Sequence, residues 1–394
     1  MPAHPSSFIA ERRGQGGDGD GQGRIELWHV LSVAADPRAA RGIRHPLSTV
    51  LTLAVAAVAA GARSLTGISA WAADLPVVHR SRFGVGRAVP SAATFARVLA
   101  GVDADVLDAV LCAWLGARTG PRGGLAPLAV DGKTARGARR GDGSRVHLFA
   151  AVTHDGRPVG QVTAPAKGFE IAAFGTLLDR VDLPGRAVTA DALHTQVTHA
   201  HYLHRHGAHY VFTVKGNQPR LHARLVALPW GQVRVAHLDV AKAHGRTERR
   251  TVQLITKIRP GLGFPHARLA ARITRTRTGP DATGRTVEVV YAISDLPEDT
   301  SPERIGAFVR GHWAMKNRLH WVRDVTFDED RSQVRTGTAP QAMATLRNTA
   351  IGLLRAAGAT NIAATSAAMH RRASRLLALL EAPRTVLTSQ PGRL

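Results

Sequence analysis

The sequence has almost no cysteine and no long uninterrupted apolar run, and each shortage excludes a class of protein. Cys112 is the only cysteine in 394 residues, which excludes a disulfide framework and a cysteine-based zinc site and fits a reducing compartment. Met1–Gly23 has no apolar core of a secretory signal. Leu47–Ala62, the most apolar run, is shorter than the ~20 residues that a membrane span needs. We therefore expect a cytoplasmic protein with no membrane partner, in which this run is a buried, Ala-rich helix.

Acidic residues are also scarce relative to basic ones. The chain has 52 Lys and Arg against 29 Asp and Glu, a formal charge of +23, with 19 His in addition. Most of the excess is Arg, whose guanidinium binds phosphate in a bidentate geometry. A GC-rich genome would explain Arg in place of Lys, but not the shortage of acids. The balance predicts a polyanionic partner, nucleic acid in the first place.

The ends of the chain and its first third have simple patterns. Residues 1–25 are rich in Gly, Asp and Arg without apolar periodicity, which predicts a disordered tail. Residues 26–120 have helical spacing, with Ser91 and Asp103 as expected N-caps. Short helices of this kind form either a helix-turn-helix or a plain helical bundle, and both interpretations stay open. Residues 356–394 predict one more helix and a tail.

From residue 125 the pattern becomes that of a mixed α/β sheet. Apolar runs between turn residues predict strands at 125–130, 146–153, 158–164, 187–190 and 210–214, with helices at 170–183 and 195–206. Residues from about 220 to 300 predict antiparallel strands that form a β-rich insertion. The expected fold class is thus an α/β catalytic domain over residues 125–355, preceded by a small helical N-terminal domain.

Asp131 and Asp191 share a position in this pattern, since each follows an apolar strand. The ends of neighbouring strands meet at one edge of an α/β sheet, where sites form. Two carboxylates at that edge suit Mg²⁺, which takes one or two carboxylates, waters and phosphate oxygens, and two-metal sites catalyse phosphoryl transfer. Taken singly, Asp131 also fits an Asp-Gly turn and Asp191 a helix cap.

A further stretch, residues 310–330, combines tryptophan, histidine and basic residues on a predicted helix. Its apolar stripe recurs at three- and four-residue steps and consists of Phe308, His312, Met315, Leu319 and Val322. Lys316 and Arg323 fall on the flank of the stripe, and His320 lies one turn beyond Lys316. A flank position suits a side chain that reaches a site, although an amphipathic helix with solvated cations fits the same spacing.

Taken together, five motifs resemble the DDE transposases of the ISAs group of insertion sequences, the H-repeat-associated proteins. They are Leu128-Ala-Val-Asp-Gly-Lys-Thr134, Val188-Thr-Ala-Asp-Ala-Leu-His-Thr-Gln196, Tyr210-Val-Phe-Thr-Val-Lys-Gly-Asn-Gln-Pro219, His244-Gly-Arg-Thr-Glu248 and the stretch His312–Asp330. The resemblance runs from about Leu27 to Leu354. It implies a ribonuclease-H-like fold with a β insertion and an N-terminal associated domain. It also implies two Mg²⁺ ions, with Mn²⁺ as a substitute, and cleavage and strand transfer of double-stranded DNA by a homo-oligomer on the nucleoid.

The resemblance implies that Asp131 and Asp191 are the two metal-binding aspartates of the family. The chain departs from the family pattern at the third acidic residue. The family pattern His-Trp-x-Ile-Glu-Asn-x-Leu-His-Trp has Glu where this chain has Lys316. An ammonium there removes a metal ligand and repels divalent ions, so we expect an impaired transposase; the alternative is a catalytically inactive, DNA-binding relic. Six basic side chains are candidates for DNA contact, with solvated or structural roles as the alternative: Lys133, Lys215, Arg246, His312, His320 and Arg323.

Overall fold

The computed structural model describes residues 25–41, 43–119, 124–139, 143–166, 168–243, 246–258, 262–279 and 284–381. The expected tail over residues 1–25 lies outside them apart from its last residue. Two compact units divide the chain. Unit 1 comprises Met1–Pro121, Gly132–Val181 and Lys316–Leu394, and unit 2 comprises Arg122–Asp131 and Asp182–Met315. No helix among the described residues is long and apolar enough to cross a membrane.

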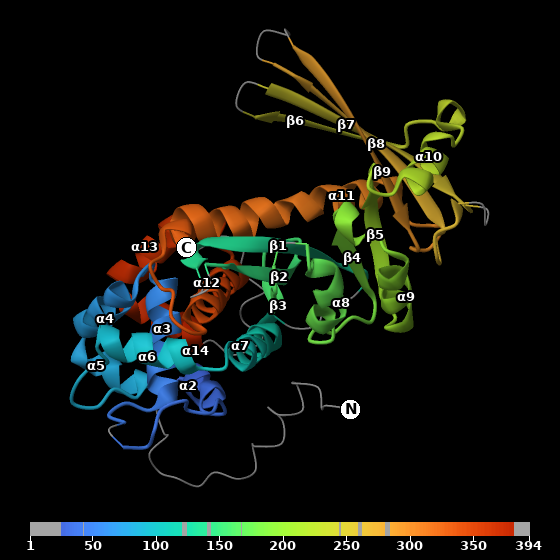
Figure 1. Cartoon of the computed structure of the whole chain (residues 1–394). Coiled ribbons are helices and arrows are strands. Elements are labelled where there is room, and N and C mark those ends of the chain that lie inside the picture. The colour runs from blue at the N-terminus through green and yellow to red at the C-terminus, as the bar shows by residue number, and fades with distance from the viewer. Residues whose placement is uncertain are drawn as a thin grey trace. The chain divides into compact units, whose positions relative to one another are not determined.

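Unit 1 is mainly helical (Figure 1). α3 is buried over its whole length, and α12 packs against α3, α6 and α7. The expected buried, Ala-rich helix is therefore present. Ser64, Ser91 and Asp103 accept hydrogen bonds from backbone N–H groups two or three residues later, as N-caps do. The helices of unit 1 are α2 (Glu26–Leu31), α3 (Leu47–Ala59), α4 (Leu65–Asp74), α5 (Val77–Arg80), η2 (Ser81–Phe83), α6 (Ala92–Gly101), α7 (Ala104–Thr119), α8 (Glu170–Leu178), η6 (Lys316–His320), η7 (Val322–Thr326), η8 (Glu329–Arg331), α12 (Ala339–Ala356), α13 (Ile362–Arg371) and α14 (Ala373–Glu381).

The strands form a nine-stranded sheet in the order β3-β2-β1-β4-β5-β9-β8-β7-β6. β1 is parallel to β4, and β4 to β5, whereas β2 and β3 form an antiparallel hairpin. Its turn contains Gly156 at φ 91°, so the expected Asp155-Gly156 hairpin is confirmed. β1 (Ala126–Arg139) belongs to both units, β2 (Arg145–Thr153) and β3 (Pro158–Ala164) to unit 1, and β4 (Arg186–Ala190), β5 (His209–Val214), β6 (His237–Ala243), β7 (Arg246–Thr256), β8 (Leu269–Thr278) and β9 (Arg285–Ser294) to unit 2.

Unit 2 has its own apolar core under α11 (Pro302–Met315). Phe308 and Ile305 of α11 pack with side chains of β4, β5, β7, β8 and β9. The antiparallel ribbon β6–β9 is the expected β insertion (Figure 1). Sequence patterns missed its edge strand β6 and the short helix α10 (Pro219–Val226) that precedes it. The other short helices of unit 2 are η3 (Ala192–His194), α9 (Val197–Arg205) and η4 (Trp230–Gln232).

Three expectations about local structure were wrong. The region after residue 356 forms two helices, α13 and α14, where one was expected. The first strand does not end in a turn at Asp131-Gly132, because β1 continues to Arg139. The single α-helix expected through Asp324 changes at Met315 into two π-helical turns, η6 and η7. A π turn bonds residue i to i+5 and rotates everything after it relative to α-helical spacing. Leu319 and Val322 of the expected apolar stripe remain buried, but Arg323, expected on its flank, is buried as well.

Candidate active site

Asp131 and Asp191 lie at matching positions of two hydrogen-bonded parallel strands in unit 2. Val130 of β1 pairs with Ala190 of β4, so the aspartates that follow are the next pair in register. Paired residues of parallel strands point to the same face, on chains ~4.8 Å apart. Both side chains are half-buried. Asp131 and Asp191 thus directly follow the last pair of the β1–β4 register.

The segment after Asp191 is fixed by its own unit. The Asp191 carboxylate accepts a hydrogen bond from the Leu193 N–H at 3.0 Å and caps η3. Asn217 donates its side-chain N–H to the Ala192 carbonyl at 2.6 Å, and Gln218 donates to the Thr195 carbonyl at 2.8 Å. The capping role and the site role of Asp191 are therefore compatible, because the second oxygen is not used by the cap. Sequence reasoning missed Asn217 and Gln218, although the Gly-Asn-Gln-Pro motif after β5 contained the signal.

Histidines in unit 2 are buried beside these aspartates. Burial, together with His199, lowers the pKa of His194 to about 4, and the Asp191 carboxylate only partly opposes this. The rings of His194 and His199 stack with centroids 5.4 Å apart, and His199 Nδ1–H donates to the His194 carbonyl. His312, a DNA-contact candidate, is also buried. His194 is therefore uncharged at neutral pH and adds no positive charge beside Asp191.

Lys316, in the third-acid position, is the first residue of η6 and is exposed. The apolar stripe on either side of it is confirmed, since Met315 and Leu319 are buried. Arg323 does not lie on the flank as expected but is fully buried in unit 1. Its guanidinium therefore does not reach a DNA phosphate in this conformation.

Arg323 belongs to a buried ion cluster, which we define as Arg323, Glu329 and Arg347. Arg323 binds Glu329 through two N–H···O bonds of 2.7 and 2.9 Å, and Arg347 donates to Glu329 at 3.1 Å. Burial disfavours the charged carboxylate, but the two arginines outweigh it and lower the pKa of Glu329 to about 2. Charge-assisted, bidentate pairs of this kind are the strong ones. The cluster therefore fixes the chain that follows η7.

Lys133 is also paired within unit 1. Its ammonium lies 2.6 Å from an Asp324 oxygen and 3.9 Å from an Asp330 oxygen, and its side chain is 10% exposed. His320 is nearby, and burial followed by the charges of Arg323 and Lys133 lowers its pKa to about 3. Lys133 and His320, both candidates for DNA contact, are thus a paired lysine and a neutral histidine. Asp324 likewise has its counter-ion.

A second buried carboxylate in unit 1 explains why β1 needs Gly132. Glu170 accepts a hydrogen bond from His147 at 2.7 Å, and Thr134 bonds the other nitrogen of the same ring at 2.9 Å. A Cβ at residue 132 would lie 2.3 Å from the Glu170 carboxylate and 2.6 Å from the His147 ring. Only glycine fits there, so Asp-Gly marks a close approach rather than a turn. Glu170 and His147 were not foreseen.

The remaining candidates for DNA contact are exposed. Lys215 follows β5, and Arg246 begins β7. Both side chains are accessible. His244, the first residue of one of the five motifs, lies outside the described residues.

The donor set fits Mg²⁺ in part. Asp131 and Asp191 supply the hard carboxylate oxygens that Mg²⁺ prefers, with water and phosphate oxygens to complete its shell. Within the described ranges, no group of three or more His, Cys, Asp or Glu is placed to hold a metal ion. Asp131 and Asp191 are thus the two carboxylates that sequence analysis offers for a metal ion, and Lys316 in the third-acid position stays a prediction.

Known proteins that are similar to this chain include transposases, as the motifs around Asp131 and Asp191 led us to expect. Residues 123–353 match the family model of the transposase DDE domain, and residues 28–115 match that of the DDE_Tnp_1-associated region. "Putative transposase YncI" of Escherichia coli O157:H7 is 28% identical over 84% of this chain and 87% of its own length. "H repeat-associated putative transposase YhhI" of Escherichia coli K12 is 27% identical over 84% and 90%. A piggyBac transposase synaptic complex with hairpin DNA aligns at 11% identity and a TM-score of 0.42, over 95% of this chain and 78% of that one. A likeness that weak supports no inference.

Proposed function

Because the chain belongs to the transposase DDE-domain family, we propose that it binds the ends of an insertion sequence and catalyses DNA strand cleavage and strand transfer through Asp131 and Asp191. The observation that supports this proposal is the register of β1 and β4, in which Val130 and Ala190, the residues before the two aspartates, are paired. The strand order β3-β2-β1-β4-β5 supports the ribonuclease-H-like arrangement that the family resemblance implies. Double-stranded DNA and a homo-oligomer assembled on it belong to the same proposal.

The chain's own residues have three tasks in this reaction. Asp131 and Asp191 would hold divalent ions, Mg²⁺ or its substitute Mn²⁺, which when bound polarise a phosphodiester and lower the pKa of a bound water. Asn217 and Gln218 keep the backbone after Asp191 in place, which preserves the aim of that carboxylate. His194 stays neutral at pH 7 because burial lowers its pKa, so it does not compete with the metal ions for Asp191.

Lys316 sets the level of activity in this proposal. The family position takes a carboxylate, and this chain presents an exposed ammonium at the start of η6. A missing ligand weakens metal binding, and a positive charge opposes a divalent ion further. Asp324 and Glu329 do not offer a replacement, because Lys133 and the two arginines of the buried ion cluster already pair with them. The same observation favours the second candidate function, a DNA-binding transposase relic without strand cleavage.

The test compares strand cleavage by the unmodified chain, Lys316→Glu and Lys316→Gln on DNA that carries the ends of the encoding element, across a Mg²⁺ titration. We expect Lys316→Glu to raise cleavage on the order of 10²- to 10³-fold. Lys316→Gln removes the repulsion without adding a ligand, so a smaller gain is expected. Arg318→Glu, with the same change of charge two residues away at an exposed position, is the matched control. Equal cleavage by the unmodified chain and Lys316→Glu would refute the assignment of Lys316, and no cleavage by any variant would favour the relic.

A further inference from the structure

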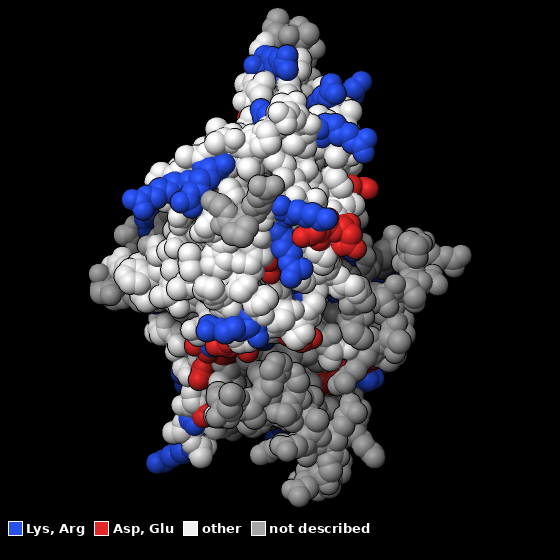
Figure 2. Space-filling view, turned by 90° about the vertical axis from the view of Figure 1, so that its right-hand side faces the viewer, with Lys and Arg blue, Asp and Glu red and all other residues white. Residues whose placement is uncertain are grey.

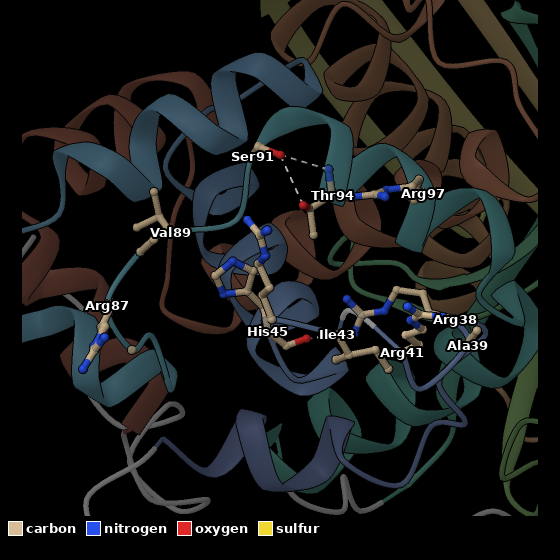
Figure 3. A pocket seen from close by; sticks show the side chains of 13 residues that line it. Arg38, Ala39, Arg41, Ile43, His45, Arg87, Val89, Ser91, Thr94 and Arg97 are labelled. Atoms are coloured by element: carbon tan, nitrogen blue, oxygen red, sulfur yellow. Dashed lines mark hydrogen bonds between the residues drawn. The ribbon is translucent and has the colours of Figure 1, made fainter.

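An arginine-lined cavity lies in the helical part of unit 1, away from the candidate active-site residues in sequence. Its volume is about 850 Å³, and three segments line it: residues 38–45, residues 86–89 and the start of α6. Figure 3 shows Ser91, Thr94 and Arg97 along one side of the view and Arg38 and Arg41 below them. On the face of the molecule in Figure 2, in contrast, Lys and Arg form separate groups, some of them beside Asp and Glu. Arginine is thus the most frequent residue in the lining of the cavity.

The charge of the lining has one sign. Five arginines, at positions 38, 41, 44, 87 and 97, contribute to it, and no Asp or Glu does. Arg38 pairs with Asp36, outside the lining, and donates to the His45 carbonyl at 2.8 Å, which fixes the 38–45 segment. Within the described ranges, the other four arginines have no hydrogen bond or ion pair of their side chains, and all four are exposed. Like charges held together repel each other unless an anion lies between them.

The pKa of His45 is affected by the same positive charges. Burial lowers it, and the charges of Arg38 and Arg44 lower it further. Burial first, and the two arginines in addition, therefore favour the neutral form of the imidazole. A second cation is disfavoured at this place, whereas an anion is favoured.

The remaining polar groups are those that contact a nucleic-acid backbone. Ser91 caps α6 and accepts a hydrogen bond from the Thr94 N–H at 3.3 Å, so the positive end of the helix dipole faces this rim. Arg97 lies six residues after Ser91, ~9 Å further along the helix axis. This distance is longer than the ~3.4 Å rise per phosphate of one DNA strand, so the two side chains do not contact the same phosphate. Arginine, Ser and Thr hydroxyls and helix N-termini are the common phosphate contacts of DNA-binding proteins.

The lining also argues against a small-molecule site. Such pockets have mainly apolar and aromatic walls with a few polar groups. Here no aromatic side chain other than His45 is present, and the apolar members are Ala39, Ile43, Ala88 and Val89. Without an aromatic platform the cavity does not suit stacking of a base. Phosphodiester groups, not bases, match its chemistry.

We infer that the arginine-lined cavity is a second DNA site, in which Arg41, Arg44, Arg87 and Arg97 bind the phosphate backbone of duplex DNA. The inference deepens the proposed function, on which it rests, because it assigns DNA capture to the helical part of unit 1 and leaves strand cleavage to Asp131 and Asp191. It predicts binding without base preference at this site, since its contacts are to the backbone.

The experiment measures the affinity of the full chain for a fluorescein-labelled duplex of arbitrary sequence over a range of salt concentrations. The cavity variant combines Arg41→Ala, Arg44→Ala and Arg97→Ala. The matched control combines Arg304→Ala, Arg371→Ala and Arg372→Ala, three exposed arginines outside the lining. Each lost phosphate contact lowers the salt slope by about 1. We expect a slope lower by about 3 for the cavity variant and little change for the control. Arg97→Ala alone, at an exposed position that does not threaten folding, should lower it by about 1.

Two results would overturn the inference. One is a cavity variant whose salt slope matches that of the control variant. The other comes from titration with pyrophosphate: loss of pyrophosphate binding with an unchanged DNA slope would make the cavity a small-anion site. The outcome of the salt-slope experiment can be separated from that of the cleavage experiment that tests the proposed function. If Lys316→Glu fails to cleave while the cavity variant still loses its slope, the DNA site stands and the catalytic assignment fails.

Discussion

Glu329 in unit 1 is closed in by two buried arginines, whereas in unit 2 Asp131 within β1 and Asp191 after β4 are half-buried. The Glu329 carboxylate uses both oxygens in hydrogen bonds to cations. Asp191 uses one oxygen for a backbone N–H, and no lysine or arginine of the described chain forms an ion pair with it. A neutralised, buried carboxylate stabilises the fold, while a half-buried one at a strand end stays accessible to a metal ion.

The same contrast separates the basic residues. Arg323 and Lys133 neutralise carboxylates inside unit 1, but the exposed arginines of the cavity have no such partner among the described residues. Position along the chain does not predict which role a cation takes. The role of each cation is determined by its ion-pair partner. That partner lies in a distant part of the sequence, as Asp324 does for Lys133.

The largest effect is expected from the strand-end aspartates. In a Lys316→Glu background, Asp131→Asn or Asp191→Asn should lower metal-dependent cleavage by on the order of 10³-fold or more. Both changes keep the side-chain size and remove a metal-binding oxygen. Duplex affinity should persist, because it depends on basic residues. Cleavage and anisotropy assays measure the two effects, with Asp299→Asn, an exposed carboxylate of unit 2, as the control. A folded variant that cleaves normally would remove that aspartate from the site.

The buried ion cluster should give the largest effect on stability. Glu329→Gln keeps the shape of the side chain but leaves Arg323 and Arg347 without their counter-charge, and loss of one partner of a buried pair costs about 3–5 kcal/mol. Urea unfolding monitored by circular dichroism gives the change. Asp328→Asn is the control, because its partner Arg331 is 86% exposed and exposed pairs contribute little. A loss of less than about 1 kcal/mol in Glu329→Gln would contradict the closed cluster.

Local signals were sufficient for much of the fold. The caps Ser91 and Asp103 and the buried helix α3 were predicted because capping and burial leave marks within a few residues. The alternation of strands and helices after residue 125 placed Asp131 and Asp191 after apolar strand residues, and Val130 and Ala190, which precede them, are paired in β1 and β4. These are features that a short window of sequence can determine.

Features that depend on distant partners were not predictable. Asp131-Gly132 was interpreted as a turn, whereas β1 continues because Glu170 and His147 pack closely against Gly132. Arg323 was placed on an open flank by α-helical spacing, but the π turns after Met315 carry it inside, where Glu329 binds it. Helical periodicity predicts neither a change from an α-helix to a π-helix nor an ion pair with a residue later in the chain.

The pH dependence of unfolding tests the neutral histidines of both units. The pKa of His194 falls to about 4 and that of His320 to about 3, so near pH 5 the unfolded chain binds two protons that the folded chain does not. Burial raises the pKa of Asp108 to about 6, which offsets one of them, because there the folded state is the one that binds the proton. The net difference of about one proton predicts that stability falls by about 1.4 kcal/mol per unit as pH drops through 5.

Urea unfolding at pH 7, 6 and 5 measures this slope. His320→Asn removes one of the two histidine protons and should flatten the slope by about 1.4 kcal/mol per unit near pH 5. His370→Asn, at an exposed position, should leave it unchanged. If His320→Asn retains the full slope, then His320 is not held neutral in the folded state.

The smallest effect is expected where unit 2 fixes the segment after Asp191. Asn217→Ala removes the N–H that the Ala192 carbonyl accepts at 2.6 Å, and a hydrogen bond of this type contributes about 0.5–1.5 kcal/mol. Because Asp191 begins the same turn, the loosened backbone should also weaken the binding of Mn²⁺ in a Lys316→Glu background, which isothermal titration measures. Gln232→Ala, an exposed amide of unit 2, is the control for both measurements. If Asn217→Ala lowered stability yet left Mn²⁺ affinity unchanged, the motif would support the fold alone, and the position of the Asp191 carboxylate would be set by β4 and its own cap.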